Sequence, residues 1–238
     1  MNRFYDEEKV DVGLGPIAVN TTAYSQYFKL SEGRRCAFVF TIGAMAAAAT
    51  LAGQLYQATD AAGTSAKVIT GATCTITANT NVKVATVTLA TCLAGETVVI
   101  NGLTFTAHAT TTTVASREFS ISGTDTADAA ELVTCINDTT YGVPGVFASS
   151  AAGVVTLRAS EPGDMYITVV GDTNATAATV AADALIEVES DMLDTANDFD
   201  HIAILLTTSA SMICNANCHR GRNRYSPVQY LSASKLGV

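Results

Sequence analysis

The chain contains no tryptophan, and aromatic residues make up only 7% of its 238 residues. Charged residues make up 15%, against roughly 25% in typical soluble domains. Since 48% of the residues are hydrophobic but few are aromatic, the core must be built from Val, Ile, Leu and Ala. The shortage of charge predicts that neighbouring molecules cover part of the surface.

Basic residues are also few, with 13 Lys and Arg against 22 Asp and Glu and a net charge of −9. This balance argues against nucleic acid as a partner, because binding to phosphates needs a basic surface. The run from Asp183 to Asp200 is acidic and contains no Lys or Arg, whereas Arg220, Arg222 and Arg224 lie near the C-terminus. The two segments are interpreted either as surfaces for self-assembly or attachment, or as two solvated loops.

The chain begins without the apolar run of a signal peptide, so we expect synthesis in a cytoplasm. Residues 36–59 carry no charge and are long enough to span a bilayer. However, Phe38, Phe40 and Ile42 alternate with smaller residues, which favours a strand, and we expect no membrane span. The six cysteines form no disulfide framework and are expected to be free thiols.

Motifs for catalysis are missing: there is no Gly-x-Ser-x-Gly, no P-loop and no dinucleotide fingerprint. In a strand, Cys214 and Cys218 would lie about 13 Å apart, too far to share one metal ion. The run from Asp194 to Asp200 lacks the Gly and the distal Glu of a calcium loop. We therefore predict no catalytic, cofactor-binding or metal-binding residue, and a protein that is not an enzyme.

Alternating segments rich in Thr and Val predict strands rather than helices. The segments are residues 22–30, 36–42, 51–58, 73–78, 82–89, 184–189, 201–206 and 211–219. Their lengths and spacing predict a mainly β chain, with an antiparallel, jelly-roll-like β-sandwich built from residues 21–94 plus 183–230. Residues 1–20 are expected to form an N-terminal arm, because Gly13, Gly15 and Pro16 interrupt any pattern, and residues 231–238 a C-terminal tail.

Residues 95–182 are predicted to be a small inserted α+β domain of the order β-β-α-β-β. Asn101-Gly102 lies between two apolar runs and indicates a hairpin with a type I′ turn. Ala129, Leu132, Val133 and Ile136 recur at helical spacing, after possible N-caps at residues 124–126. Two further strands are expected at residues 153–158 and 165–170, joined by a turn at Pro162-Gly163.

Three further segments of the chain are Gly95–His108, Arg117–Leu132 and Ile136–Val146. They resemble a module common in structural proteins of tailed bacteriophages. Residues 24–35, 57–64 and 220–228 are similar to their outer domain. The resemblance covers most of the chain after residue 20 and points to virion structural proteins as a class.

Within that class, the resemblance implies a capsid decoration, or cement, protein on the outside of the phage head. It implies binding to the major capsid protein, self-association into a homo-oligomer that is often a trimer, and a location on the virion. A head–tail connector or tail protein is the first alternative. A host-surface glycan-binding module is the second, although no tryptophan is present to line a sugar site.

Aromatic residues and arginines near the chain ends are the predicted partner-binding residues, because both types are enriched where protein surfaces bury each other. These residues are Phe4, Tyr5, Arg220, Arg222, Arg224 and Tyr225.

Overall fold

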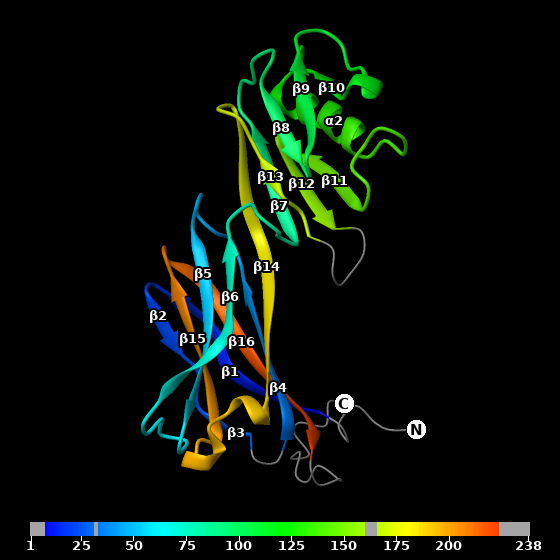
Figure 1. Cartoon of the computed structure of the whole chain (residues 1–238). Helices are drawn as coiled ribbons and strands as arrows, with labels where there is room; N and C mark the ends of the chain where they lie inside the picture. The colour runs from blue at the N-terminus through cyan, green and yellow to red at the C-terminus, as the bar shows by residue number, and fades with distance from the viewer. Residues whose placement is uncertain (1–7, 31–32, 160–165, 224–238) are drawn as a thin grey trace, which may run out of the picture. The chain divides into compact units, whose positions relative to one another are not determined.

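A computed structural model describes residues 8–30, 33–159 and 166–223 of the chain (Figure 1). Their contacts divide the chain into two compact units. Unit 1 holds the described residues up to Thr41, Leu51–Thr75 and those from Ala184 onward. Unit 2 holds Ile42–Thr50 and the described residues of Ile76–Asp183. The chain is mainly β, as the sequence predicts.

Unit 1 contains two antiparallel sheets. The first sheet has the order β1, β16, β4, β14, and the second has the order β2, β15, β5, β6, with β3 also paired to β15. The strands of the first sheet are β1 (Glu8–Val19), β16 (Met212–Asn223), β4 (Gly33–Ile42) and β14 (Ala175–Glu189), whose last residues belong to this unit. Those of the second are β2 (Thr22–Tyr24), β3 (Phe28–Lys29), β5 (Thr50–Ala58), β6 (Lys67–Thr77) and β15 (His201–Thr208).

The path of the chain between these sheets is that of a jelly roll. β1 lies in the first sheet, β2 in the second, β4 in the first, and β5 and β6 in the second. After the residues of unit 2, β14 returns to the first sheet, β15 to the second and β16 to the first. This confirms the predicted antiparallel β-sandwich, and unit 2 is inserted mainly between β6 and β14.

Alternation along the strands builds the core of unit 1. Phe38, Phe40 and Cys36 on β4 are fully buried, as are the alternate residues of β16 from Met212 to Cys218. The second sheet approaches closely at Gly53 on β5, where a Cβ atom would lie 2.8 Å from the ring of Phe40. Glycine is therefore required at residue 53, because a side chain would push the two sheets apart.

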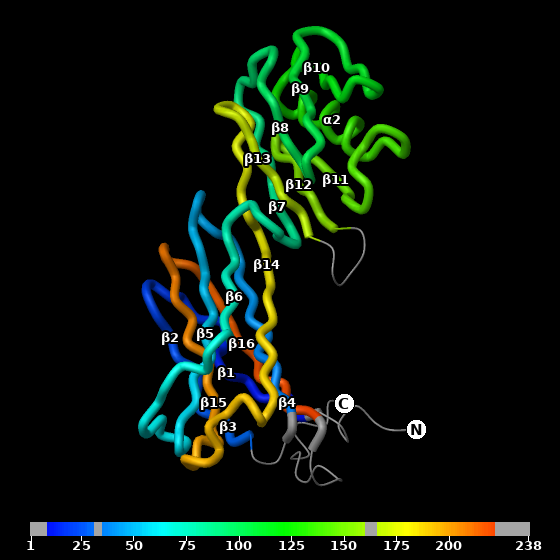
Figure 2. Tube along the Cα trace, viewed as in Figure 1, coloured from blue at the N-terminus to red at the C-terminus, as the bar shows by residue number. Residues whose placement is uncertain are grey.

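The predicted N-terminal arm is largely a strand. β1 pairs with β16 along its length, with Asp11 opposite Cys218, and only residues 1–7 lie outside the described residues. Figure 2 shows this first described strand (blue) beside the last one (red). Register shifts fall between Val12 and Leu14 and between Leu14 and Ile17. Gly13, Gly15 and Pro16 thus mark bulges within a strand and not an unpaired segment.

Unit 2 contains the predicted hairpin and helix. Asn101 and Gly102 both have positive φ, 47° and 80°, as a type I′ turn requires. The hairpin strands are β8 (Thr97–Ile100) and β9 (Leu103–His108). The helix α2 (Asp125–Ile136) buries Ala129, Leu132 and Ile136, and the side chain of Thr124 accepts a hydrogen bond from the N–H of Ala127 at its start.

The strands of unit 2 form two groups. β8 and β9 belong to the order β10, β9, β8, β13, whereas the first part of β14 belongs to the order β14, β7, β12, β11. The predicted strands near residues 153–158 and 165–170 therefore lie in different groups, and the turn expected at Pro162-Gly163 lies outside the described residues. The remaining elements are β7 (Val84–Leu89), η1 (Val114–Ser116), β10 (Glu118–Ser120), β11 (Val146–Ala151), β12 (Val154–Ala159) and β13 (Val169–Val170).

The long segment of unit 2 begins at Ile76, ahead of the start predicted at residue 95, and it includes β7, which pairs with β12 on one side and with β14 on the other. Val87 and Leu89 on β7 are buried. The partner strand β14 bulges between Thr179 and Ala181, opposite Ala85 and Val84.

These boundaries predict how the insert can be removed. A chain in which residues 76–183 are replaced by a flexible Gly-Ser linker should still unfold cooperatively, because both sheets of unit 1 keep their strands. A chain lacking only residues 95–182 should bind a hydrophobic dye and aggregate, because β7 loses both partners and exposes Val87 and Leu89. Thermal unfolding followed by circular dichroism distinguishes the two chains. Cooperative unfolding of only the second chain would contradict this division.

Candidate attachment surface

The predicted partner-binding residues lie mostly beyond the described part of the chain. Phe4, Tyr5, Arg224 and Tyr225 are outside it, and so is the predicted tail of residues 231–238. Arg222 lies in β16, but its side chain is not described. Arg220 alone of the six has a described side chain.

Arg220 makes its contacts inside unit 1. Its Nε donates a hydrogen bond to Asp11 Oδ2 at 3.1 Å, and Nη2 forms an ion pair with the same oxygen. Its Nη1 donates to the backbone carbonyl of Lys29 at 2.7 Å, and its guanidinium lies 5.7 Å from the centre of the Phe28 ring. The side chain is only 13% exposed, so Arg220 joins β1 of the first sheet to β3 of the second. Its described contacts indicate a structural role and lend no support to the partner-binding role predicted for it.

A different surface, the outer face of the first sheet, exposes large apolar side chains. We define this outer face by four residues: Val10, Val12, Leu185 and Ile213. Their exposed fractions are 43%, 61%, 54% and 60%, respectively. They come from β1, β14 and β16, which are strands of one sheet, so the residues belong to one side of the sandwich. Exposed apolar side chains on one side of a sheet make that side a candidate surface for binding another molecule.

Strand register places polar neighbours among these apolar residues. Val12 is opposite Asn217 and Val10 is opposite His219, and residues directly opposed in an antiparallel pair point to the same side. Thr41 on β4 donates a hydrogen bond to Asn215 on β16. The outer face therefore combines apolar side chains with amides, a hydroxyl and an imidazole, and the exposed ion pair of Arg35 on β4 with Glu187 on β14 lies on the same sheet. Such a mixed surface suits a protein partner.

The opposite side of the sandwich carries a cluster of tyrosines. The rings of Tyr24 on β2 and Tyr56 on β5 lie edge to face with their centres 5.6 Å apart. Burial and the hydrogen bond to Tyr56 raise the pKa of Tyr24, and burial with the nearby Tyr56 raises the pKa of Tyr27. The sequence gives no sign of this cluster, because Tyr24 and Tyr56 become neighbours only through the separate pairing of β2 and β5 with β15.

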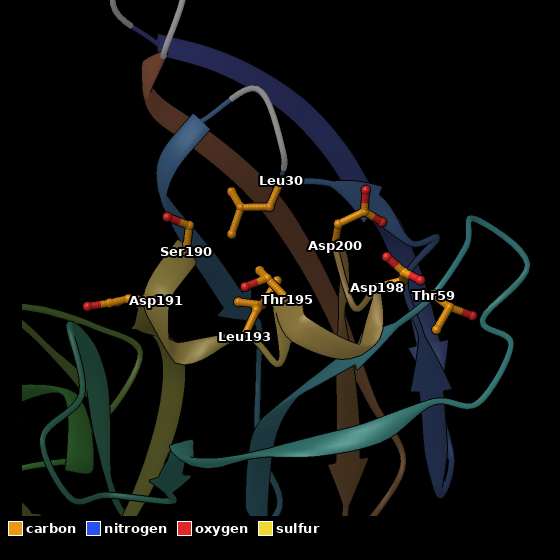
Figure 3. A pocket seen from close by; sticks show the side chains of 8 residues that line it. All are labelled: Leu30, Thr59, Ser190, Asp191, Leu193, Thr195, Asp198 and Asp200. Carbon is orange, nitrogen blue, oxygen red and sulfur yellow. The ribbon is translucent and has the colours of Figure 1, made fainter.

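The acidic run found in the sequence lines a pocket in unit 1 of about 540 Å³. Figure 3 shows its side chains around the loop that contains η2 (Ser190–Met192) and η3 (Thr195–Asn197). The Nδ1 of His201 lies 2.6 Å from Asp200 Oδ1, and the Lys29 ammonium lies 3.4 Å from the other oxygen. The complete lining is Leu30, Thr59, Ser190, Asp191, Leu193, Thr195, Asp198 and Asp200. The carboxylates in this lining favour the binding of a cationic group.

Contacts within unit 1 hold the loop around this pocket in place. Gln57 Oε1 accepts a hydrogen bond from the Asp194 N–H at 2.8 Å, and the Lys67 ammonium pairs with the Asp194 carboxylate. Lys67 also lies 4.0 Å from the centre of the Phe199 ring. The hydrogen bond from Lys67, aided by that from Asn197, lowers the pKa of Asp194. Asp194 therefore holds the loop in place, whereas other residues of the same acidic run line the pocket.

The largely buried Arg220 and the exposed Arg35 are expected to contribute differently to the free energy of unfolding. Arg220→Ala removes a largely buried pair with Asp11 and the bond to the Lys29 carbonyl, and it leaves Asp11 with the more exposed Lys9 as its cation, so the free energy of unfolding should fall by about 3 kcal/mol. Arg35→Ala is the control, because its ion pair with Glu187 is exposed by 42% and 40% and should contribute less than about 1 kcal/mol. Denaturant unfolding of the two variants measures both values. An effect of Arg220→Ala no larger than that of Arg35→Ala would overturn the structural role.

Among the described residues, no group of three His, Cys, Asp or Glu side chains is placed to hold a metal ion. None of the described helices has the length and the apolar character needed to cross a membrane. The chain matches no protein-family model and no curated protein sequence.

Proposed function

We propose that this chain is a virion structural protein that decorates the outside of a bacteriophage head by binding the major capsid protein. The proposal extends the resemblance of residues 95–146 and of the outer-domain segments to phage structural proteins. The observation that supports it is the outer face of the first sheet, where Val10, Val12, Leu185 and Ile213 are exposed. In this function the chain acts by binding and not by catalysis.

The size of the outer face limits how strongly one copy binds. Complete burial of a Val, Leu or Ile side chain contributes about 1.5–3 kcal/mol, and these four side chains are about half exposed before binding. Association also costs several kcal/mol in lost translational and rotational freedom. One copy is therefore expected to bind weakly, and a homo-oligomer such as a trimer would bind through several outer faces at once and gain avidity.

A head–tail connector or tail protein is the alternative within the same class. It would use the same apolar face, but at a position that occurs in few copies per particle. Gel quantification of purified particles separates the two, because decoration requires a copy number close to that of the major capsid protein.

The tyrosine cluster on the other side of the sandwich favours one further candidate, a glycan-binding module. Aromatic faces bind sugar rings, and Tyr24 is 51% exposed beside Tyr56. Retention of the purified chain on host-cell envelopes, abolished by Tyr24→Ala, would support this function. Unchanged retention with that variant, or no retention at all, would exclude the cluster as a glycan site.

Charged substitutions on the outer face test attachment. Val12→Asp and Ile213→Asp should each lower occupancy on particles that lack this protein by at least tenfold, because a carboxylate would be buried without a partner. Val68→Asp on β6 is the matched control, because Val68 is 45% exposed in the second sheet. Thermal unfolding of each variant shows whether the fold is retained.

The arginines near the C-terminus form the second arm of the same test. If the predicted basic segment contributes to attachment, Arg222→Ser combined with Arg224→Ser should weaken binding at least about tenfold. Loss of binding in this variant alone would assign attachment to the C-terminal segment. Normal occupancy of all variants at limiting protein would overturn attachment through either surface.

A further inference from the structure

Two cysteine thiols meet in the core of unit 1. Cys36 lies on β4 and Cys218 on β16, which are neighbouring strands of the first sheet. Their Sγ atoms are 3.2 Å apart, and both residues are completely buried. A disulfide bond is about 2.0 Å long, so the two sulfur atoms need to approach by only about 1.2 Å.

We propose that Cys36 and Cys218 form an intramolecular disulfide when the chain folds in oxidising surroundings. The oxidant is a small-molecule disulfide such as oxidised glutathione. The thiolate of one cysteine attacks it, forms a mixed disulfide and releases one glutathione thiolate. The thiolate of the other cysteine then attacks the protein sulfur of that mixed disulfide and releases the second thiolate. Two protein thiols are oxidised, one small disulfide is reduced, and the two protons pass to the released thiolates.

The folded, reduced protein resists this reaction. The hydrogen bond to Cys218 and burial raise the pKa of the Cys36 thiol, so that it stays protonated and is a poor nucleophile. Complete burial of both residues also excludes an oxidant of the size of glutathione. Both exchange steps therefore occur before β16 closes completely onto β4, while the approach of the two strands brings the sulfur atoms together for the second step.

The other four cysteines are separated from one another. Cys214 Sγ contacts the carbonyl of Met212 at 3.8 Å, and Cys135 Sγ donates to the carbonyl of Glu118 at 3.4 Å. Burial, with Glu96 nearby, raises the pKa of Cys92 to about 12, and Cys74 is partly exposed. Among the described residues, no second pair of thiols is in contact. In the folded chain, Cys36 and Cys218 are thus the pair of cysteines expected to form a disulfide.

The cross-link would join distant parts of the chain. Cys36 and Cys218 are 182 positions apart in the sequence, and the closed loop contains all of unit 2. A disulfide that closes so long a loop reduces the freedom of the unfolded chain and so stabilises the folded state. It would also attach β16, the neighbour of β1, covalently to β4. This inference is independent of the proposed function.

Oxidative refolding tests the pair. The denatured, reduced chain is refolded in a buffer of reduced and oxidised glutathione, and the thiols are counted after alkylation and mass spectrometry under denaturing conditions. The count should fall from six to four, and peptide mapping should join the peptides of Cys36 and Cys218. The midpoint of thermal unfolding should be higher for the oxidised chain than for the reduced one.

Single substitutions provide the controls. Cys36→Ala leaves five thiols, and all five should remain after oxidative refolding. Cys214→Ala also leaves five, but these should fall to three, because Cys214 lies on the same side of β16 and has no thiol neighbour in the described part. Six remaining thiols in the correctly folded natural chain, or a map that joins other cysteines, would overturn the proposal. The peptide map of the natural chain decides the matter even if Cys36→Ala does not fold.

Discussion

The structure of unit 1 depends on one constraint: each of its antiparallel sheets can bury only one side against the other. β4 and β16 turn their alternate apolar residues inward, and Gly53 lets the second sheet approach the ring of Phe40. The outer sides of both sheets must then face either solvent or another molecule. On the first sheet that side exposes Val12, Leu185 and Ile213, which water solvates poorly. The low content of charged residues in the chain accompanies this partly apolar outer face, and both motivate the proposed attachment to a protein partner.

Polar contacts close the sandwich where apolar packing ends. Arg220 satisfies Asp11 on one sheet and a backbone carbonyl on the other, while its flat guanidinium approaches the Phe28 ring. Such a residue combines a charge-assisted pair with partial burial, and removing either partner would leave the other desolvated. The same strand, β16, carries Cys218 on its inner side and Ile213 on its outer side. One strand therefore contributes to the core, to the closure of the sandwich and to the candidate attachment surface.

Unit 2 shows how a jelly roll can carry an insert without losing its own strand pairs. The connection between β6 and β14 contains most of unit 2, and both flanking strands keep partners in unit 1. Insertion at a connection is tolerated because the entropy of loop closure grows only slowly with length. The insert has its own helix, hairpin and buried core, including Leu132 and Phe105.

The sequence alone determined the features that depend on near neighbours. The period of two predicted strands at residues 36–42 and 211–219, the Asn101-Gly102 pair predicted the hairpin, and the spacing of Ala129, Leu132 and Ile136 predicted the helix. These signals are local, because each follows from backbone geometry over a few residues. The same periodicity also indicated a sandwich with an insert.

Only the tertiary structure decided which strands are neighbours. Glycine and proline in residues 13–16 indicated an arm, whereas pairing with β16 makes them bulges in a strand. The pairing of β7 with β12 moved the start of the insert to Ile76. Arg220 and Asp11, 209 positions apart, meet only because β1 lies beside β16, and Cys36 meets Cys218 only because β16 lies beside β4. Periodicity states which side of a strand is buried, but not which strand lies next to it, because strand order is set by the packing of the whole core.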